Sequence, residues 1–111
     1  MITKELFAKV EALPLCIIEQ FEVIGNSIEY WDTEDERKYF TSINDFAFSC
    51  KSKFLSLGYI LDSGQTPTCG RCSVDSKTSS KVEYFKSKTE QEAIFKACEY
   101  ILRESSNKDN K

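Results

Sequence analysis

The sequence predicts an α+β fold: a small, mostly antiparallel sheet of four to five strands with three helices, in the order α-β-β-β-α-β-(β)-β-α. Two observations predict it. Three stretches repeat apolar residues at helical spacing behind capping residues, and the stretches between them are short apolar runs separated by turns. The first strands are joined by links too short for a crossover helix, so they should pair antiparallel.

The three helices are recognised by their caps and by their apolar faces. Thr3, Ser42 and Thr89 each stand just before an amphipathic run, as N-cap residues do. Gly58 follows the second run, where a C′ glycine ends a helix. We therefore expect helices over 3–12, 42–57 and 89–104. The expected buried residues are Phe46, Cys50, Phe54 and Leu57 in the second helix, and Ile94, Ala97, Cys98, Ile101 and Leu102 in the third.

The strands are expected between these helices. Residues 15–24 are rich in Ile, Val and Phe, and Gly25-Asn26 then offers a two-residue hairpin turn into 27–31. A helix over 16–24 is an open alternative, because the run is short. Residues 63–80 are rich in turn-forming residues, which predicts a long loop or a loose hairpin around 72–74. Further strands are expected at 37–41, 59–61 and 81–86.

The chain has the length of one ordinary domain. We expect a single α+β domain over 1–104 and a disordered tail over 105–111, where the sequence becomes polar. No stretch has the roughly 20 apolar residues that span a bilayer, and the first residues lack the apolar segment of a secretion signal. The sequence therefore predicts a cytoplasmic protein without a membrane partner, whose five cysteines stay reduced.

Composition excludes several catalytic chemistries. The chain has no histidine, which removes Ser-His and Cys-His nucleophile pairs, imidazole metal ligands and histidine proton shuttles. It also has no Gly-rich phosphate loop, because its four glycines are isolated turn residues. We therefore expect a protein that is not an enzyme, with no catalytic residue and no cofactor, zinc being the one alternative.

The motif Cys69-Gly70-Arg71-Cys72 carries the most specific chemistry. Two thiolates at this spacing can hold a metal ion from a tight knuckle, so Cys69 and Cys72 would supply half of a four-ligand zinc site. A redox dithiol is a further alternative, but such motifs stand at a helix start, which lowers the pKa of the first thiol. The favoured interpretation is a polar loop that happens to contain two thiols.

The segment 29–36 mixes aromatic and acidic side chains. Exposed Trp and Tyr are frequent interface anchors, so this segment is a candidate surface for binding another protein. The competing interpretation is a strand end whose rings face the core, followed by a solvated turn. The predicted interaction residues are Tyr30, Trp31, Asp32 and Glu34.

The segment 71–88 carries five bases and two acids around Tyr84 and Phe85. A basic, aromatic strand can hold single-stranded nucleic acid through phosphate contacts and stacking. The whole protein is acidic, however, with a formal net charge of −3. This disfavours a nucleic-acid partner and favours scattered surface lysines.

A resemblance is carried by two parts of the second half of the chain. Residues 42–59, and the strand Tyr84-Phe85-Lys86 followed by the capped helix of 89–102, resemble short prophage-encoded proteins of the ABA-sandwich kind. The similarity covers about half of the chain. It implies a small accessory protein of a phage or mobile element and assigns no functional residue.

The favoured function is a small non-enzymatic domain that interacts with another protein, of prophage or mobile-element origin. Compactness, the lack of catalytic motifs and the aromatic acidic segment 29–36 favour it. The alternatives are a zinc-binding domain that uses Cys69 and Cys72 as a half-site, and single-stranded nucleic-acid binding through 71–88.

Overall fold

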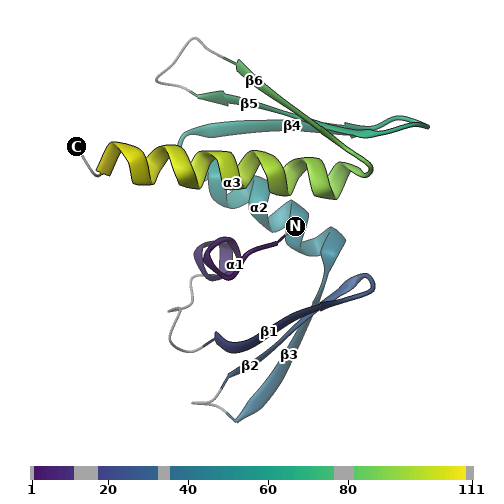
Figure 1. Ribbon diagram of the computed structural model, residues 1–111, viewed down its shortest axis with the longest axis vertical. Coiled ribbons are helices and arrows are strands. Elements are labelled where there is room, and N and C mark those ends of the chain that lie inside the picture. Colours follow the sequence, from purple (N-terminus) through teal and green to yellow (C-terminus); the bar gives the residue numbers. More distant parts are fainter. Residues whose placement is uncertain (1, 12–17, 33–35, 77–81, 110–111) are drawn as a thin grey trace. The chain divides into compact units, whose positions relative to one another are not determined.

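The computed structural model describes residues 2–11, 18–32, 36–76 and 82–109, and it has an α+β architecture (Figure 1). Helices and strands follow one another in the expected order, and the strand predicted only as a loose hairpin is present. No helix among the described residues is both long and apolar enough to cross a membrane. The elements are α1 (Lys4–Glu11), β1 (Ile18–Ile24), β2 (Ser27–Asp32), β3 (Arg37–Ser42), α2 (Ile43–Ser56), β4 (Tyr59–Gln65), β5 (Gly70–Ser76), β6 (Val82–Ser87) and α3 (Glu90–Asp109).

The six strands form two antiparallel sheets of three strands each, β1–β2–β3 and β4–β5–β6. The sequence predicted one sheet of four to five strands, and this part of the fold prediction is not confirmed. Each sheet consists of strands that are consecutive in the chain and pair as hairpins. The 14-residue α2 separates β3 from β4 in the chain. The three strands before α2 and the three strands after it therefore form their backbone hydrogen bonds among themselves.

The chain divides into two compact units, which we call the N-terminal unit (Ile2–Ser49) and the C-terminal unit (Cys50–Lys111). The division falls inside α2. Each unit has its own sheet and its own buried side chains. The single domain over 1–104 stays a prediction. Helix α3 continues to Asp109, through part of the segment expected to be a tail, and residues 110 and 111 lie outside the described part.

In the N-terminal unit, α1 and the sheet share an aromatic core. The ring of Phe7 lies 5.0 Å from that of Phe46 and 5.1 Å from that of Tyr30, the latter edge-on at 66°. Thr3 is the N-cap of α1, since its Oγ1 accepts a hydrogen bond from Leu6 N at 3.1 Å. Phe7 is completely buried. The hydrogen bond to Thr3 confirms the predicted start of the helix.

The hairpin turn and the start of α2 are also as expected. Gly25 has a φ of 59°, the left-handed conformation that a two-residue hairpin turn requires. Asp45 N donates to Ser42 Oγ at 3.0 Å, so Ser42 caps α2. Ile43 N donates to Asn26 O at 2.8 Å, which ties the helix start to the turn. The N-cap at Ser42 and the turn at Gly25 were both predicted from the local sequence.

In the C-terminal unit, α3 lies along one face of the β4–β5–β6 sheet (Figure 1). Strand β5 is central and alternates buried Cys72 and Val74 with exposed Arg71 and Asp75. Thr89 caps α3 by accepting from Glu92 N at 3.2 Å, as predicted. The buried side chains of this unit include Cys50, Phe54, Leu61, Cys69, Cys72, Val74, Ala93, Ile94, Phe95, Ala97, Cys98 and Ile101.

Three expectations from the sequence need correction or fall outside the described residues. The segment 63–80 was expected to be a long loop or a loose hairpin around 72–74; in its described part, 63–76, β4 reaches Gln65 and a short link from Thr66 to Cys69 leads into the regular strand β5. Leu57 was expected in the buried stripe of α2 but is 46% exposed, because α2 ends at Ser56. Residues 12–17, 33–35 and 77–81 are not described.

A hydrogen-bonded bridge joins three elements of the C-terminal unit. Ser63 Oγ of β4 donates to Glu90 Oε2 of α3 at 2.7 Å and accepts from Lys51 Nζ of α2 at 3.0 Å. All three side chains are half-buried. One hydroxyl therefore provides a partner for both a carboxylate and an ammonium group, each of which is costly to leave unpaired below the surface.

Replacing Ser63 with alanine is expected to lower the free energy of unfolding by about 1–2 kcal/mol, because two charged groups lose their hydrogen bonds. Urea unfolding followed by circular dichroism measures this change. Ser73→Ala is the matched control: Ser73 Oγ donates to Asp62 O over a longer 3.4 Å, and its loss should cost less than about 0.5 kcal/mol. Equal stability of the two variants would show that the bridge contributes nothing.

Candidate functional site

The exposed face of the β1–β2–β3 sheet carries large apolar side chains. Strand alternation turns Ile28 and Tyr30 to one face and Trp31 to the other, because side chains along a strand point to opposite faces in turn. Trp31 is 38% exposed, Phe40 is 66% exposed and Ile24 is 48% exposed. We call this surface, formed by Ile24, Glu29, Trp31, Lys38 and Phe40, the Trp31 face.

An ion pair lies within the Trp31 face. Lys38 Nζ is 3.1 Å from Glu29 Oε1, and it stands 5.8 Å from the centre of the Phe40 ring. Register explains this arrangement, since Trp31 is opposite Lys38 and Glu29 is opposite Phe40. The two charges and the two rings therefore alternate across β2 and β3. Such a surface offers apolar contact and a charge pair at the same place.

The four predicted interaction residues do not share one surface. Trp31 is exposed, whereas Tyr30 is turned to the other side of the sheet, where its ring stacks on Tyr39 with centroids 5.2 Å apart. Asp32 ends β2, and its side chain is not among those described; Glu34 lies outside the described residues. The competing interpretation, that the rings face the core, thus holds for Tyr30.

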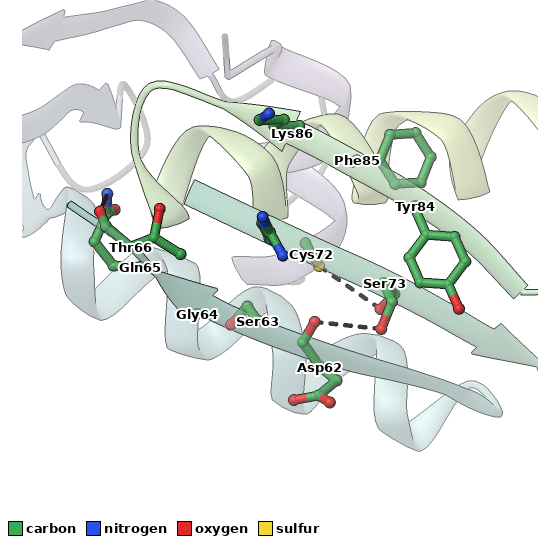
Figure 2. A pocket seen from close by; sticks show the side chains of 11 residues that line it. Asp62, Ser63, Gly64, Gln65, Thr66, Cys72, Ser73, Tyr84, Phe85 and Lys86 are labelled. Atoms are coloured by element: carbon green, nitrogen blue, oxygen red, sulfur yellow. Dashed lines mark hydrogen bonds between the residues drawn. The ribbon is translucent and has the colours of Figure 1, made fainter. Parts of the chain in front are cut away.

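A hollow of about 580 Å³ lies on the exposed face of β4–β5–β6 (Figure 2). The buried face of this sheet is covered by α3, and the residues that line the hollow include those that alternate with the buried ones, such as Arg71, Ser73 and Tyr84. Gly64 leaves it open, because a Cβ added there would have no atom within 4 Å. The volume falls within the range of small-ligand sites, about 300–1,000 Å³.

Strand register orders the lining side chains into rows across the three strands. One row brings two cations together at one end, and the next row combines an aromatic ring, a hydroxyl and a carboxylate. Figure 2 shows Tyr84, Ser73 and Asp62 following one another across the sheet. The rows are Gly64–Arg71–Lys86 and Asp62–Ser73–Tyr84.

Cys69 and Cys72 are both buried, but their thiols lie in different surroundings. Cys72 is on the face of β5 that α3 covers, and burial together with the nearby Cys98 raises the pKa of Cys72 to about 12. Cys69 precedes β5. A hydrogen bond with the Thr66 hydroxyl, 3.5 Å from Cys69 Sγ, lowers the pKa of Cys69, and the nearby Arg71 side chain acts in the same direction. The pair therefore does not behave as two equivalent ligands.

The Cys69–Cys72 motif does not form the knuckle that the zinc alternative requires. Strand β5 begins at Gly70, so the backbone of 70–72 is extended and rises about 3.3 Å per residue. Among the residues that the structure describes, no group of three or more Cys, Asp or Glu is placed to hold a metal ion. Zinc at a structural site takes four ligands. The zinc alternative gains no support here and stays a prediction.

The remaining described cysteines are core residues. Cys50 of α2 and Cys98 of α3 are completely buried. A hydrogen bond with the Cys50 thiol and burial raise the pKa of Cys98. Both side chains therefore fill space in the core as small apolar groups, as the sequence predicted for these helical positions.

Alkylation should distinguish the two cysteines of the motif. Since the thiolate is the nucleophile, Cys69 is expected to react with iodoacetamide at a lower pH than Cys72, whose pKa is raised to about 12. Mass spectrometry after tryptic cleavage at Arg71, which separates the two thiols, measures each rate. In urea the difference should vanish. Equal rates in the folded protein would contradict the described surroundings.

Comparison of this chain with protein-family models, with curated protein sequences and with solved structures finds no match. The resemblance to short prophage-encoded proteins therefore stays a prediction, because none of these comparisons bears on it.

Sequence reasoning found parts of both surfaces and missed others. It selected Trp31 but not Phe40, which lies on the neighbouring strand and meets the Trp31 face only through register. It selected the bases and Tyr84 of 71–88 but not Gly64 or Asp62, which β4 contributes. A usable signal was the alternation of apolar and polar residues from Arg71 to Asp75, which marks β5 as a strand.

Proposed function

We propose that this chain is a small non-enzymatic domain that binds another protein through the Trp31 face. The observation that carries the proposal is the exposure of Trp31, Phe40 and Ile24 on one face of a single sheet. Exposed apolar clusters with polar surroundings are typical of protein interaction sites, and Trp is enriched among residues that dominate binding energy.

Charge supports a particular kind of partner. The N-terminal unit contains ten Asp and Glu against four Lys and Arg, a formal net charge of −6. An acidic surface attracts basic partners and speeds their encounter. The partner is therefore a protein whose contact surface has an apolar centre and basic residues around it. A cytoplasmic location and a prophage or mobile-element origin belong to the same proposal.

The polar clusters of the described residues favour binding over catalysis. Ser63, with Lys51 and Glu90, is the arrangement closest to an activated nucleophile. Its hydroxyl proton is directed at the Glu90 carboxylate, and the Lys51 ammonium donates to its oxygen. A nucleophilic serine needs a base that accepts its proton and an oxygen that faces a substrate. Here the Lys51 ammonium occupies the oxygen, so the second condition is not met. The bridge is instead arranged as a link between α2, β4 and α3.

The test is a pull-down from cell lysate with the immobilised wild-type chain and with the Trp31→Ala and Phe40→Ala variants. Quantitative mass spectrometry identifies the proteins that each of them retains. The Tyr84→Ala variant is the matched control, because Tyr84 is also an exposed aromatic but lies on the C-terminal unit. The expected result is one basic protein that is lost from the first two variants and kept by the control. Truncation of an interface anchor costs about 2 kcal/mol or more, roughly thirtyfold in affinity.

Two results would overturn the proposal. One is that the wild-type chain and the Trp31→Ala and Phe40→Ala variants retain the same proteins in the same amounts. The other is that a purified partner binds both variants as tightly as wild type. Circular dichroism of each variant excludes unfolding as the reason for lost binding.

A further inference from the structure

The acidic character of the protein is confined to one of its units. The C-terminal unit contains eleven Lys and Arg against eight Asp and Glu, a formal net charge of +3, while the N-terminal unit has a net charge of −6. The overall charge that disfavoured nucleic acid in the sequence therefore comes from the unit that does not contain 71–88. The hollow on β4–β5–β6 belongs to a basic unit.

Two cations face each other at one end of the hollow. Arg71 and Lys86 are directly opposite on β5 and β6, and both are exposed. The backbone of Lys86 is held by α3, since Lys96 Nζ donates to Lys86 O at 3.1 Å. Like charges directly opposite each other in a sheet repel. An anion bound at this end would relieve the repulsion and gain charge-assisted hydrogen bonds.

An aromatic platform stands next to the cations. Tyr84 is 78% exposed, the most exposed large hydrophobic side chain described, and it lies two residues before Lys86 on the same face of β6. The two positions are therefore about 6.6 Å apart along the strand. Figure 2 shows the Tyr84 ring projecting beside Ser73 at the open side of the hollow. An exposed ring beside a basic row is the arrangement that holds a base by stacking and its phosphate by charge.

We infer that the open face of β4–β5–β6 is a binding site for single-stranded nucleic acid. Arg71 and Lys86 bind the phosphates, a base stacks on Tyr84, and the space left by Gly64 admits the sugar. The face is open along the direction of the β-strands, so a longer oligonucleotide can extend beyond it at both ends. This inference is independent of the Trp31 face, which lies on a different sheet.

The far end of the hollow adds a base preference. Asp62 is exposed and presents only hydrogen-bond acceptors when ionised. A carboxylate accepts from the exocyclic amino group of cytosine, whereas the edges of thymine and uracil place a carbonyl there. Cytosine-containing strands are therefore bound more tightly than thymine-containing strands of the same length. Asp62→Asn should remove this preference while leaving the stacking unchanged.

Fluorescence anisotropy of a short labelled oligo(dC) with the full chain tests the site. The expected result is binding at low salt that weakens with a log–log slope of about −1.4, the value for two phosphate contacts on a single strand. Tyr84→Ala should weaken binding roughly tenfold or more, and Tyr84→Phe should keep it. The double variant Arg71→Ala, Lys86→Ala should flatten the salt dependence. Oligo(dT) should bind more weakly than oligo(dC).

Two further variants separate the site from general effects. Gly64→Leu fills the hollow without meeting another atom at its Cβ, so it should abolish binding while the protein stays folded. Trp31→Ala, on the other unit, should leave binding unchanged. Absence of binding to oligo(dC) at low salt, or equal binding by wild type and the Tyr84→Ala variant, overturns the inference. If free cytidine monophosphate competes as strongly as the oligonucleotide, the ligand is a mononucleotide and the inference of a single-stranded nucleic acid is wrong.

Discussion

Replacing Gly70 with alanine is expected to destabilise the C-terminal unit by about 3 kcal/mol, the upper end of the range for overpacking. Gly70 begins β5, where it pairs with Gln65 and Ser87, and it is buried under the start of α3. A Cβ at this position would overlap backbone atoms of Thr89 and Glu90. Backbone cannot move aside as the end of a flexible side chain can, so either the strand or the helix start must shift.

Amide hydrogen exchange of β5 and α3, together with urea unfolding, measures the loss. Gly64→Ala is the matched control, since Gly64 is also a strand glycine but has no atom within 4 Å of an added Cβ. This control should change stability by less than about 0.5 kcal/mol. If the Gly70→Ala variant is as stable as the control, the close approach of β5 to α3 is wrong.

The second large effect is expected in the N-terminal unit. Phe7→Ala removes a completely buried ring that contacts both Phe46 and Tyr30, and it should cost about 3–5 kcal/mol. The loss has two parts, the transfer free energy of the ring and the cavity that remains between α1, α2 and β2. Urea unfolding followed by the fluorescence of Trp31, the one tryptophan of the chain, reports on this unit.

Phe48→Ala is the control for this prediction. Phe48 is the same residue type, lies in the same unit and is 67% exposed on α2, so its removal should cost less than about 0.5 kcal/mol. A similar loss for both variants would contradict the assigned core. The experiment also tests the predicted single domain over 1–104: in a single cooperative domain, Phe7→Ala lowers amide protection in β4–β6 as well as in β1–β3.

The helices were the most predictable part of the fold, because caps and helical spacing are local. Thr3, Ser42 and Thr89 each accept a hydrogen bond from the backbone three residues later, as predicted. The carboxylate of Glu92, three residues after Thr89, accepts a hydrogen bond from Ser87 Oγ at 2.8 Å. Another backbone donor of the helix start, Glu90 N, is satisfied by Gln65 Oε1 at 2.7 Å, from a residue 25 positions earlier.

The central strand of the second sheet was the least predictable element. Turn-forming residues on both sides of it predicted only a long loop or a loose hairpin around 72–74. The buried face of the strand consists of Gly70, Cys72 and Val74. Small residues are needed there because α3 lies close to the strand, most closely at Gly70. Strand propensity measured from composition is low in such a segment, and tertiary packing overrides it.

The sequence by itself determined the α+β class, the order of the elements, the helix starts and the hairpin turn at Gly25. All of these depend on residues within a few positions of one another. Only the tertiary structure decided that the strands form two sheets and that Trp31 is exposed while Tyr30 is packed. It also decided that Arg71 lies opposite Lys86, next to the exposed ring of Tyr84. Those features depend on strand register and on helix packing, which bring together residues distant in the chain and are set by the sum of many weak contacts.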